Sequence, residues 1–121
     1  MKYIILFFLF INTAVHSQKS DDFIGYWINR DKSITIEIYK NEESYYGKIS
    51  NSTIQKIQNK KNKILIYQMS ARSNRKLYGG MFSDIIKNDQ YEIKMKLINP
   101  THMVISRANR LFPKKHYWNK I

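Results

Sequence analysis

The stretch FIGYWINRDKSITIEIYK, residues 23–40, determines how this chain is expected to fold. It contains a Gly-x-Trp, a short polar break at Asp31 and Lys32, and then isoleucines at every second position. Alternation of apolar and polar residues is typical of a strand with one face buried and the other in water. The stretch therefore predicts two consecutive antiparallel strands that are joined by a turn and anchored by Trp27.

The rest of the chain repeats this pattern of short strands and polar turns. Residues 90–97 show it most clearly, because apolar side chains there alternate with Glu92, Lys94 and Lys96. About eight strands with hairpin-length links favour an antiparallel barrel or sandwich over a βαβ arrangement, and closure into a barrel would remove the exposed sheet edges. Residues 51–62 lack alternation and predict a helical turn or a lid loop, and residues 70–76 predict a polar loop. The other expected strands are 44–50, 63–69, 77–86, 102–108 and 116–121, of which 77–86 carries a bulge or bend at Gly79-Gly80.

The first residues, MKYIILFFLFINTAVHSQ, are expected to form a secretory signal peptide. Lys2 gives the positive start, an apolar run follows, and Val15 and Ser17 supply small side chains before the cleavage site. The apolar run is shorter than the ~20 residues that a transmembrane helix needs. The sequence thus predicts a signal peptide at 1–17 and a single domain at 18–121, located in the periplasm or secreted.

The composition is strongly basic and contains no cysteine. An excess of Lys and Arg gives a net charge of +12 at pH 7, which favours anionic partners such as cell-surface glycans or lipid head groups. A general richness in Lys, Asn, Ile and Tyr offers a purely compositional explanation of the same charge. No disulfide can form, and because only His102 and His116 follow the signal, neither a metal site nor another cofactor is expected. Nucleic acid is not expected as a partner of an exported chain.

No catalytic constellation is visible, so the protein is expected not to be an enzyme. The acidic residues fall mostly in predicted turns or on wet strand faces, and no Ser or acid lies beside His116 in the sequence. An eight-stranded barrel is just wide enough to be filled by its own side chains or to hold one small ligand. The bulky inward candidates predict a filled or nearly filled core with, at most, a shallow pocket at one mouth for a small apolar ligand. The residues expected at this mouth are Tyr45, Gly47, Gly79 and Gly80.

The alternative function is an envelope-associated interaction module that binds anionic glycans or lipids through a basic surface. Its predicted contacts come from two polar segments, and the outward rings of Tyr46 and Tyr78 could stack on a sugar. The predicted anion-contacting residues are Lys56, Lys60, Lys61, Lys63, Arg72, Arg75 and Lys76.

Trp27 is expected to plug one end of the barrel and to fix the register of the first strand. Gly25 lets the chain bend into the barrel wall without a side chain in the way. Arg107 is in phase with the apolar residues before it, so it is predicted to point inward and to cover the Trp27 ring as a cation–π partner.

The runs GYW…ITIEIYKN…YYGKI, GGMFSD…YEIKMKL and MVISRAN…YWNKI resemble the bacterial domain-of-unknown-function family 2147 over residues 23–121. The resemblance implies a lipocalin-like (calycin), up-and-down barrel in a secreted or periplasmic protein without an agreed activity, and it adds Trp118 to the barrel-closing residues. Ala108, Lys120 and the segment 51–75 depart from the family pattern. The matching residues are Gly25, Trp27, Glu37, Ile38, Tyr39, Gly47, Lys48, Ile49, Gly80, Tyr91, Leu97, Arg107 and Trp118.

Overall fold

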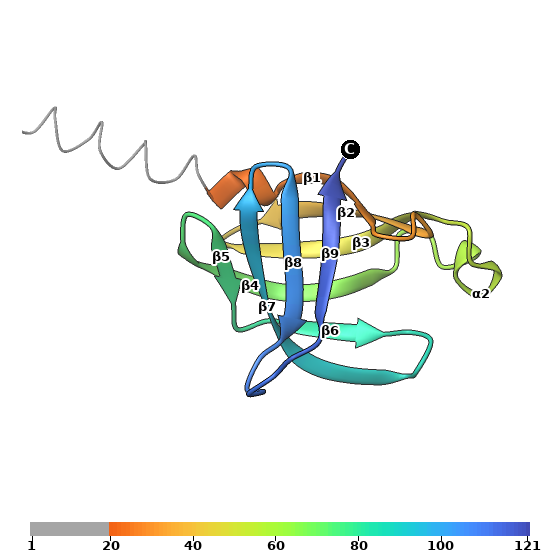
Figure 1. The fold of residues 1–121 in the computed structure, drawn as a ribbon. Helices are drawn as coiled ribbons and strands as arrows, with labels where there is room; N and C mark the ends of the chain where they lie inside the picture. Colours follow the sequence, from red (N-terminus) through yellow and green to blue (C-terminus); the bar gives the residue numbers. More distant parts are fainter. Residues whose placement is uncertain (1–19) are drawn as a thin grey trace, which may run out of the picture.

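The computed structural model describes residues 20–121, so the predicted signal peptide at 1–17 lies outside the described residues. Within this range nine strands form one antiparallel sheet (Figure 1). A 3-10 turn, η1 (Asp21–Phe23), precedes the sheet, and a single helical turn, α2 (Gln55–Gln58), lies between two strands. The strands are β1 (Gly25–Asn29), β2 (Ile34–Asn41), β3 (Ser44–Ser52), β4 (Ile64–Ser73), β5 (Lys76–Tyr78), β6 (Met81–Asp84), β7 (Asp89–Asn99), β8 (His102–Arg107) and β9 (Lys115–Lys120).

The sheet closes on itself as an up-and-down barrel. Strands β1 to β4 pair in chain order, β7 to β9 do the same, and β9 returns to pair with β1, where Trp27 lies opposite Lys120. Strands β5 and β6 both lie between β4 and β7, so they are two halves of one interrupted strand. The described sheet therefore has eight positions in its wall, which confirms the predicted all-β antiparallel barrel of about eight strands.

The interruption between β5 and β6 falls at Gly79-Gly80, as predicted. Gly79 has φ +83°, a conformation that favours glycine, and a Cβ at Gly80 would clash with the main-chain oxygen of Tyr67 in β4. The predicted loop at 70–76 was wrong in part, because β4 continues to Ser73 and β5 begins at Lys76. This hairpin has mostly exposed side chains, so its strands lack the apolar alternation from which a strand is recognised.

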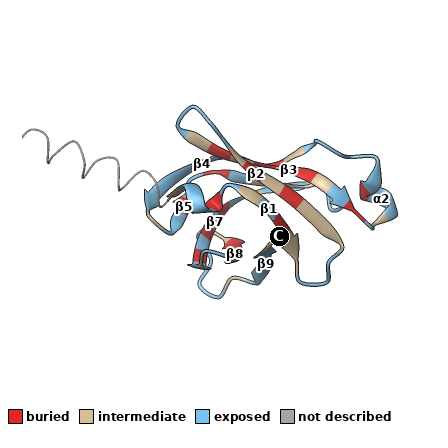
Figure 2. Cartoon of the chain, turned by 90° about the horizontal axis from the view of Figure 1, so that it is seen from above, coloured by how far each residue is buried: buried red, intermediate tan, exposed pale blue. Residues whose placement is uncertain are grey.

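The segment between β3 and β4 was predicted as a helical turn or a lid loop, and it contains the helical turn α2. Ile57 of α2 is buried and belongs to the barrel core. Figure 2 shows that buried positions follow the strands at regular intervals, as expected for walls with one wet face. The alternation predicted for β2 is confirmed, since Ile36 and Ile38 are buried while Glu37 faces outward and pairs with Lys48 at 3.7 Å.

One end of the barrel is plugged by aromatic side chains. Trp27 is 0% exposed, and its Nε1 donates a hydrogen bond of 2.9 Å to the carbonyl oxygen of Phe23. The Phe23 ring lies 6.5 Å from the ring of Tyr45, whose hydroxyl donates to Asp21 Oδ1 at 2.8 Å. The predicted burial of Trp27 is therefore confirmed, and η1 completes the closure.

The predicted contact between Arg107 and Trp27 was wrong. The cation over the indole is Lys120, with Nζ 5.5 Å from the ring of Trp27 and 2.8 Å from the carbonyl oxygen of Asp22. Arg107 instead lies 3.7 Å from the ring of Tyr91. The strand register explains the difference, because Lys120 is the direct partner of Trp27 in the β1–β9 pairing, whereas Arg107 is at the far end of β8.

We expect Lys120→Met to lower the free energy of unfolding by about 1 kcal/mol, because it removes both the cation–π contact and a hydrogen bond to a main-chain oxygen. Urea denaturation followed by tryptophan fluorescence measures the change. Arg107→Met is the matched control and should leave the environment of Trp27 unchanged. A changed environment of Trp27 in the Arg107 variant, together with an unchanged one in the Lys120 variant, would contradict this assignment.

Candidate ligand-binding cavity

A cavity of about 730 Å³ opens at the end of the barrel opposite the Trp27 plug. Four connections surround its mouth: the β1–β2 turn, the segment that contains α2, the β6–β7 turn and the β8–β9 connection. The wall is mainly aliphatic and aromatic, as in sites for small apolar molecules. Its apolar residues are Ile34, Ile49, Ile57, Leu65, Phe82, Ile85, Ile86, Tyr91, Ile93, Ile105, Phe112, Tyr117 and Trp118.

The inner part of the barrel is packed, and the free volume lies towards the mouth. Ile49 and Ile93 line the cavity but are only 1% exposed, whereas Phe82, Ile85 and Tyr91 nearer the mouth are partly exposed. A filled or nearly filled core with, at most, a shallow pocket at one mouth was expected, so the cavity of about 730 Å³ is larger than predicted.

The mouth is not where it was predicted. Tyr45, Gly47, Gly79 and Gly80 do not line the cavity. A Cβ at Gly47 would lie 2.9 Å from Ile66 Cδ1, so a neighbouring side chain already fills the space that this glycine leaves. Tyr45 is buried near the plugged end, where it borders a separate shallow depression.

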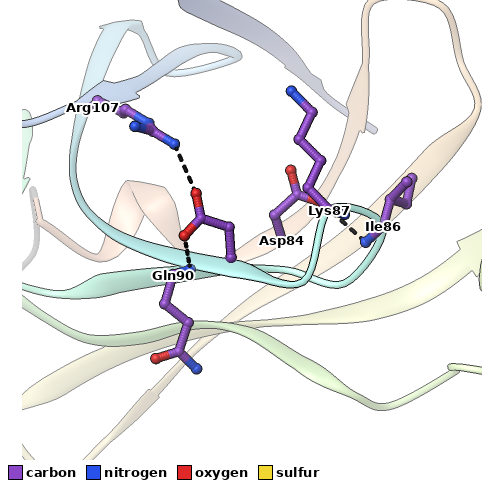
Figure 3. A network of polar contacts seen from close by, with 6 residues as sticks. Asp84, Ile86, Lys87, Gln90 and Arg107 are labelled. Atoms are coloured by element: carbon purple, nitrogen blue, oxygen red, sulfur yellow. Dashed lines mark hydrogen bonds and ion pairs between the residues drawn. The ribbon is translucent and has the colours of Figure 1, made fainter.

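Basic side chains dominate the polar part of the cavity. Among the described residues, six Lys or Arg side chains line it, against two carboxylates, Asp31 and Asp84. Both carboxylates accept hydrogen bonds within their own turns, Asp31 from Ser33 and Asp84 from the amides of Ile86 and Lys87 at 3.0 Å (Figure 3). The basic residues are Arg30, Lys87, Arg107, Arg110, Lys114 and Lys115.

Arg107 is fixed at the wall by two contacts. Its Nη2 lies 3.3 Å from Asp89 Oδ2 (Figure 3), and its guanidinium stacks on Tyr91. Asp89 Oδ1 also accepts a hydrogen bond from the amide of Gln90 at 2.8 Å. Arg107, predicted as a barrel-closing residue at the Trp27 end, thus lines the open end instead.

Two titratable groups in the cavity have shifted pKa values, each in the direction that favours the neutral form. Burial raises the pKa of Tyr91, and Asp84 raises it further. Partial desolvation lowers the pKa of His116, and the charges of Lys114 and Lys87 lower it further. The positive charge of the mouth therefore comes from its lysines and arginines.

Trp118 was predicted to help close the barrel, and it lies in the cavity wall at 9% exposed. It pairs with Asn29 of β1 and Met103 of β8, so it stands at the seam between the first and last strands. Its buried Nε1 has no hydrogen-bond acceptor among the described residues. A buried donor without an acceptor is destabilising by about 1–3 kcal/mol.

The predicted anion-contacting residues do not form one surface. Lys56, Lys60, Lys61 and Lys63 are exposed on and around α2, on the right of Figure 1, whereas Arg72, Arg75 and Lys76 are exposed on the β4–β5 hairpin, on the left. Arg75 Nη1 donates to the carbonyl oxygen of Ile98 at 3.3 Å, which ties that hairpin to the end of β7. Tyr46 and Tyr78 are partly exposed, with their rings against Tyr39 and Arg72 respectively.

The residues that sequence reasoning missed lie in the connections around the mouth. Lys87, Arg110, Phe112 and Lys114 belong to no strand, so strand periodicity gives no information about them. A usable signal was present, because Leu111-Phe112 is an apolar pair inside an otherwise polar connection.

A closed antiparallel meander of eight wall positions, with a Trp plug at one end and an apolar cavity at the other, defines a lipocalin-like barrel. Among solved structures, protein HP1028 from the human pathogen Helicobacter pylori, which belongs to the lipocalin family, is similar to this chain. The TM-score is 0.66, the identity is 12%, and the match covers 82% of each chain. At this identity the likeness shows the fold alone.

No family model and no curated protein sequence matches the chain. The resemblance to family 2147 therefore stays a prediction, while its implied lipocalin-like barrel is confirmed. Among residues 20–121, no helix is long and apolar enough to cross a bilayer.

Proposed function

We propose that the protein is a non-catalytic carrier that binds one small apolar molecule in the open end of its barrel. The observation that carries the proposal is the cavity of about 730 Å³ with its aliphatic and aromatic wall. Sites for small molecules usually have volumes of about 300–1,000 Å³ and bury most of the ligand surface. The cavity is therefore large enough for a single ligand of this class.

The polar groups of the cavity suggest how such a ligand lies. Its apolar part would contact Phe82, Ile93 and Ile105, and its polar end would stay near the basic mouth. The ligand would then be oriented with its apolar part inward.

A large side chain in the cavity should block binding. We expect Ile105→Trp to weaken binding of the fluorescent probe 1-anilinonaphthalene-8-sulfonate at least about tenfold, because the indole would take the ligand's volume. Ile98→Trp adds the same side chain at an exposed position on the other side of the barrel wall and is the matched control. Fluorescence titration measures both affinities.

A ligand site in this cavity would be contradicted if the unaltered protein gave no saturable probe signal. It would also be contradicted if the two variants bound the probe with equal affinity. A melting temperature close to that of the unaltered protein in each variant shows that the barrel is intact. Native mass spectrometry of protein from its own cells adds a direct test for a bound molecule. The intact mass of this protein also tests the export predicted from the sequence, which requires loss of residues 1–17.

The second candidate function is the envelope-associated module that contacts anionic glycans or lipids. What supports it is the exposure of the basic side chains around α2 and on the β4–β5 hairpin. Because these two groups lie on opposite sides of the barrel (Figure 1), a single flat glycan surface could contact only one of them. The carrier is therefore the better supported proposal.

A further inference from the structure

The open end of the barrel exposes large apolar side chains on two of its connections. Leu111 and Phe112 in the β8–β9 connection are 87% and 90% exposed, and Ile86 in the β6–β7 turn is 54% exposed. Phe112 and Ile86 line the same cavity. Single exposed apolar residues are normal on a protein surface, but two adjacent ones in almost full contact with water, next to a cavity, suggest a binding surface.

Cationic side chains flank these apolar residues. Arg110 precedes the apolar pair, Lys114 and Lys115 follow it, and Lys87 is next to Ile86. The ion pairs found between residues 20 and 121 are Lys40–Asp21, Lys48–Glu37 and Arg107–Asp89, so none of them neutralises these four cations. We call the surface made by Ile86, Lys87, Arg110, Leu111, Phe112, Lys114 and Lys115 the mouth patch.

We propose that the mouth patch docks the barrel, open end first, on the surface of an anionic lipid bilayer. Leu111 and Phe112 would enter the interface between head groups and acyl chains, and the four cations would contact lipid phosphates. Apolar side chains on a basic background are the combination that binds such interfaces, because burial of the apolar groups adds to attraction by the anionic lipids. This step does not depend on whether the cavity holds a ligand.

The exposed apolar side chains of the mouth patch favour a bilayer over a glycan as the binding partner. Soluble anionic polymers would be attracted by the cationic side chains, but they have no apolar phase in which Leu111 and Phe112 could be buried. The segment 53–63 around α2, by contrast, contains no exposed large apolar side chain. If the proposed carrier function holds as well, docking would place the mouth of the cavity against the membrane, so a lipid-like ligand could pass between them without crossing water.

A fluorophore at a single position can show which part of the protein meets the membrane. The chain contains no cysteine, so Phe112→Cys and Ile98→Cys each give one site for a nitrobenzoxadiazole label in the full-length protein. We expect vesicles of phosphatidylcholine with phosphatidylglycerol to shift the emission of the label at position 112 to shorter wavelength. The label at position 98, remote from the mouth patch, should keep its emission in water, and vesicles of phosphatidylcholine alone should shift neither label.

Charge reversal tests the contribution of the cations. Lys114→Glu combined with Lys115→Glu should weaken vesicle binding at least about tenfold, because two attractions to the anionic surface become repulsions. Lys94→Glu combined with Lys96→Glu makes the same change of net charge on the exposed face of β7 and should weaken it much less. Leu111→Ser combined with Phe112→Ser should weaken vesicle binding without changing the net charge.

Equal losses in the two lysine pairs would overturn the proposal, because they would mean that overall charge alone attracts the protein. Equal emission shifts at positions 112 and 98 would also overturn it. Far-ultraviolet circular dichroism and the melting temperature show whether each variant is folded. The probe titration of the cavity is a separate measurement, so failure of docking and failure of ligand binding are distinguishable.

Discussion

Replacement of Trp27 by alanine should remove about 3–5 kcal/mol of stability, a large fraction of the roughly 5–15 kcal/mol that holds a small domain together. The side chain is 0% exposed and fills the plugged end of the barrel, where its Nε1 binds the carbonyl oxygen of Phe23. Truncation would leave a cavity among Phe23, Tyr45 and the inner face of β1. Urea denaturation monitored by circular dichroism measures the loss.

The neighbouring Tyr26 provides the matched control. It precedes Trp27 in β1, points to the opposite face and is 47% exposed. Tyr26→Ala should therefore lower the free energy of unfolding by no more than about 1 kcal/mol. The loss of stability in Trp27→Phe should be intermediate between those of the two alanine variants, since Phe keeps an aromatic ring but loses the hydrogen bond. If the Trp27 and Tyr26 alanine variants were equally stable, Trp27 would not be the plug.

Replacement of Gly80 by alanine should lower the free energy of unfolding by about 3 kcal/mol, because the added methyl group would meet main-chain atoms, which cannot move aside as a flexible side chain can. The nearest atoms are the carbonyl oxygen of Tyr67, then Met69 Sδ at 2.5 Å and the amide nitrogen of Met69 at 2.9 Å from the added Cβ. Strands β4 and β6 would have to separate. Hydrogen exchange gives a local readout, since the amide of Ile93 donates to the carbonyl oxygen of Gly80 and should lose protection.

Gly79 is the natural control for this substitution. A Cβ there has no neighbour within 4 Å, but φ is +83°, so Gly79→Ala carries a conformational penalty of about 1–2 kcal/mol without a clash. The amide of Ile93 should stay protected in this variant. A Gly79 variant less stable than the Gly80 variant would show that backbone conformation, not close approach of β4, explains the glycine pair.

Much of the barrel could be predicted because strands with one buried face carry a period of two. The isoleucines of β2 and the alternation around Ile93 correctly predicted where these strands lie and which face of each is buried. Arg107 shows the limit of this reasoning, because periodicity tells which face a side chain takes but not which end of the barrel it reaches. The end depends on which residue is paired with Trp27, and this is set by the pairing of β1 with β9, which are far apart in the sequence.

The site was harder to predict than the fold. Gly47 and Gly80 suggested open space, yet each glycine lets the neighbouring strand β4 come closer, so the space is filled. The actual mouth is built from four connections far apart in the sequence, and residues such as Arg110 and Phe112 become neighbours of the cavity only once the sheet closes. Loop positions of this kind have no periodic signal.

The pairing of β1 with β9 also has a consequence for how the protein folds. It joins segments from opposite ends of the described chain, for example Trp27 with Lys120, and the amide of Ile121 donates to the carbonyl oxygen of Tyr26 at 2.9 Å. Such non-local contacts raise the contact order and slow folding, because loop entropy is lost before the contact stabilises the chain. The hairpins should thus form early and this seam late. A circular permutant that joins the neighbouring ends would make the seam local.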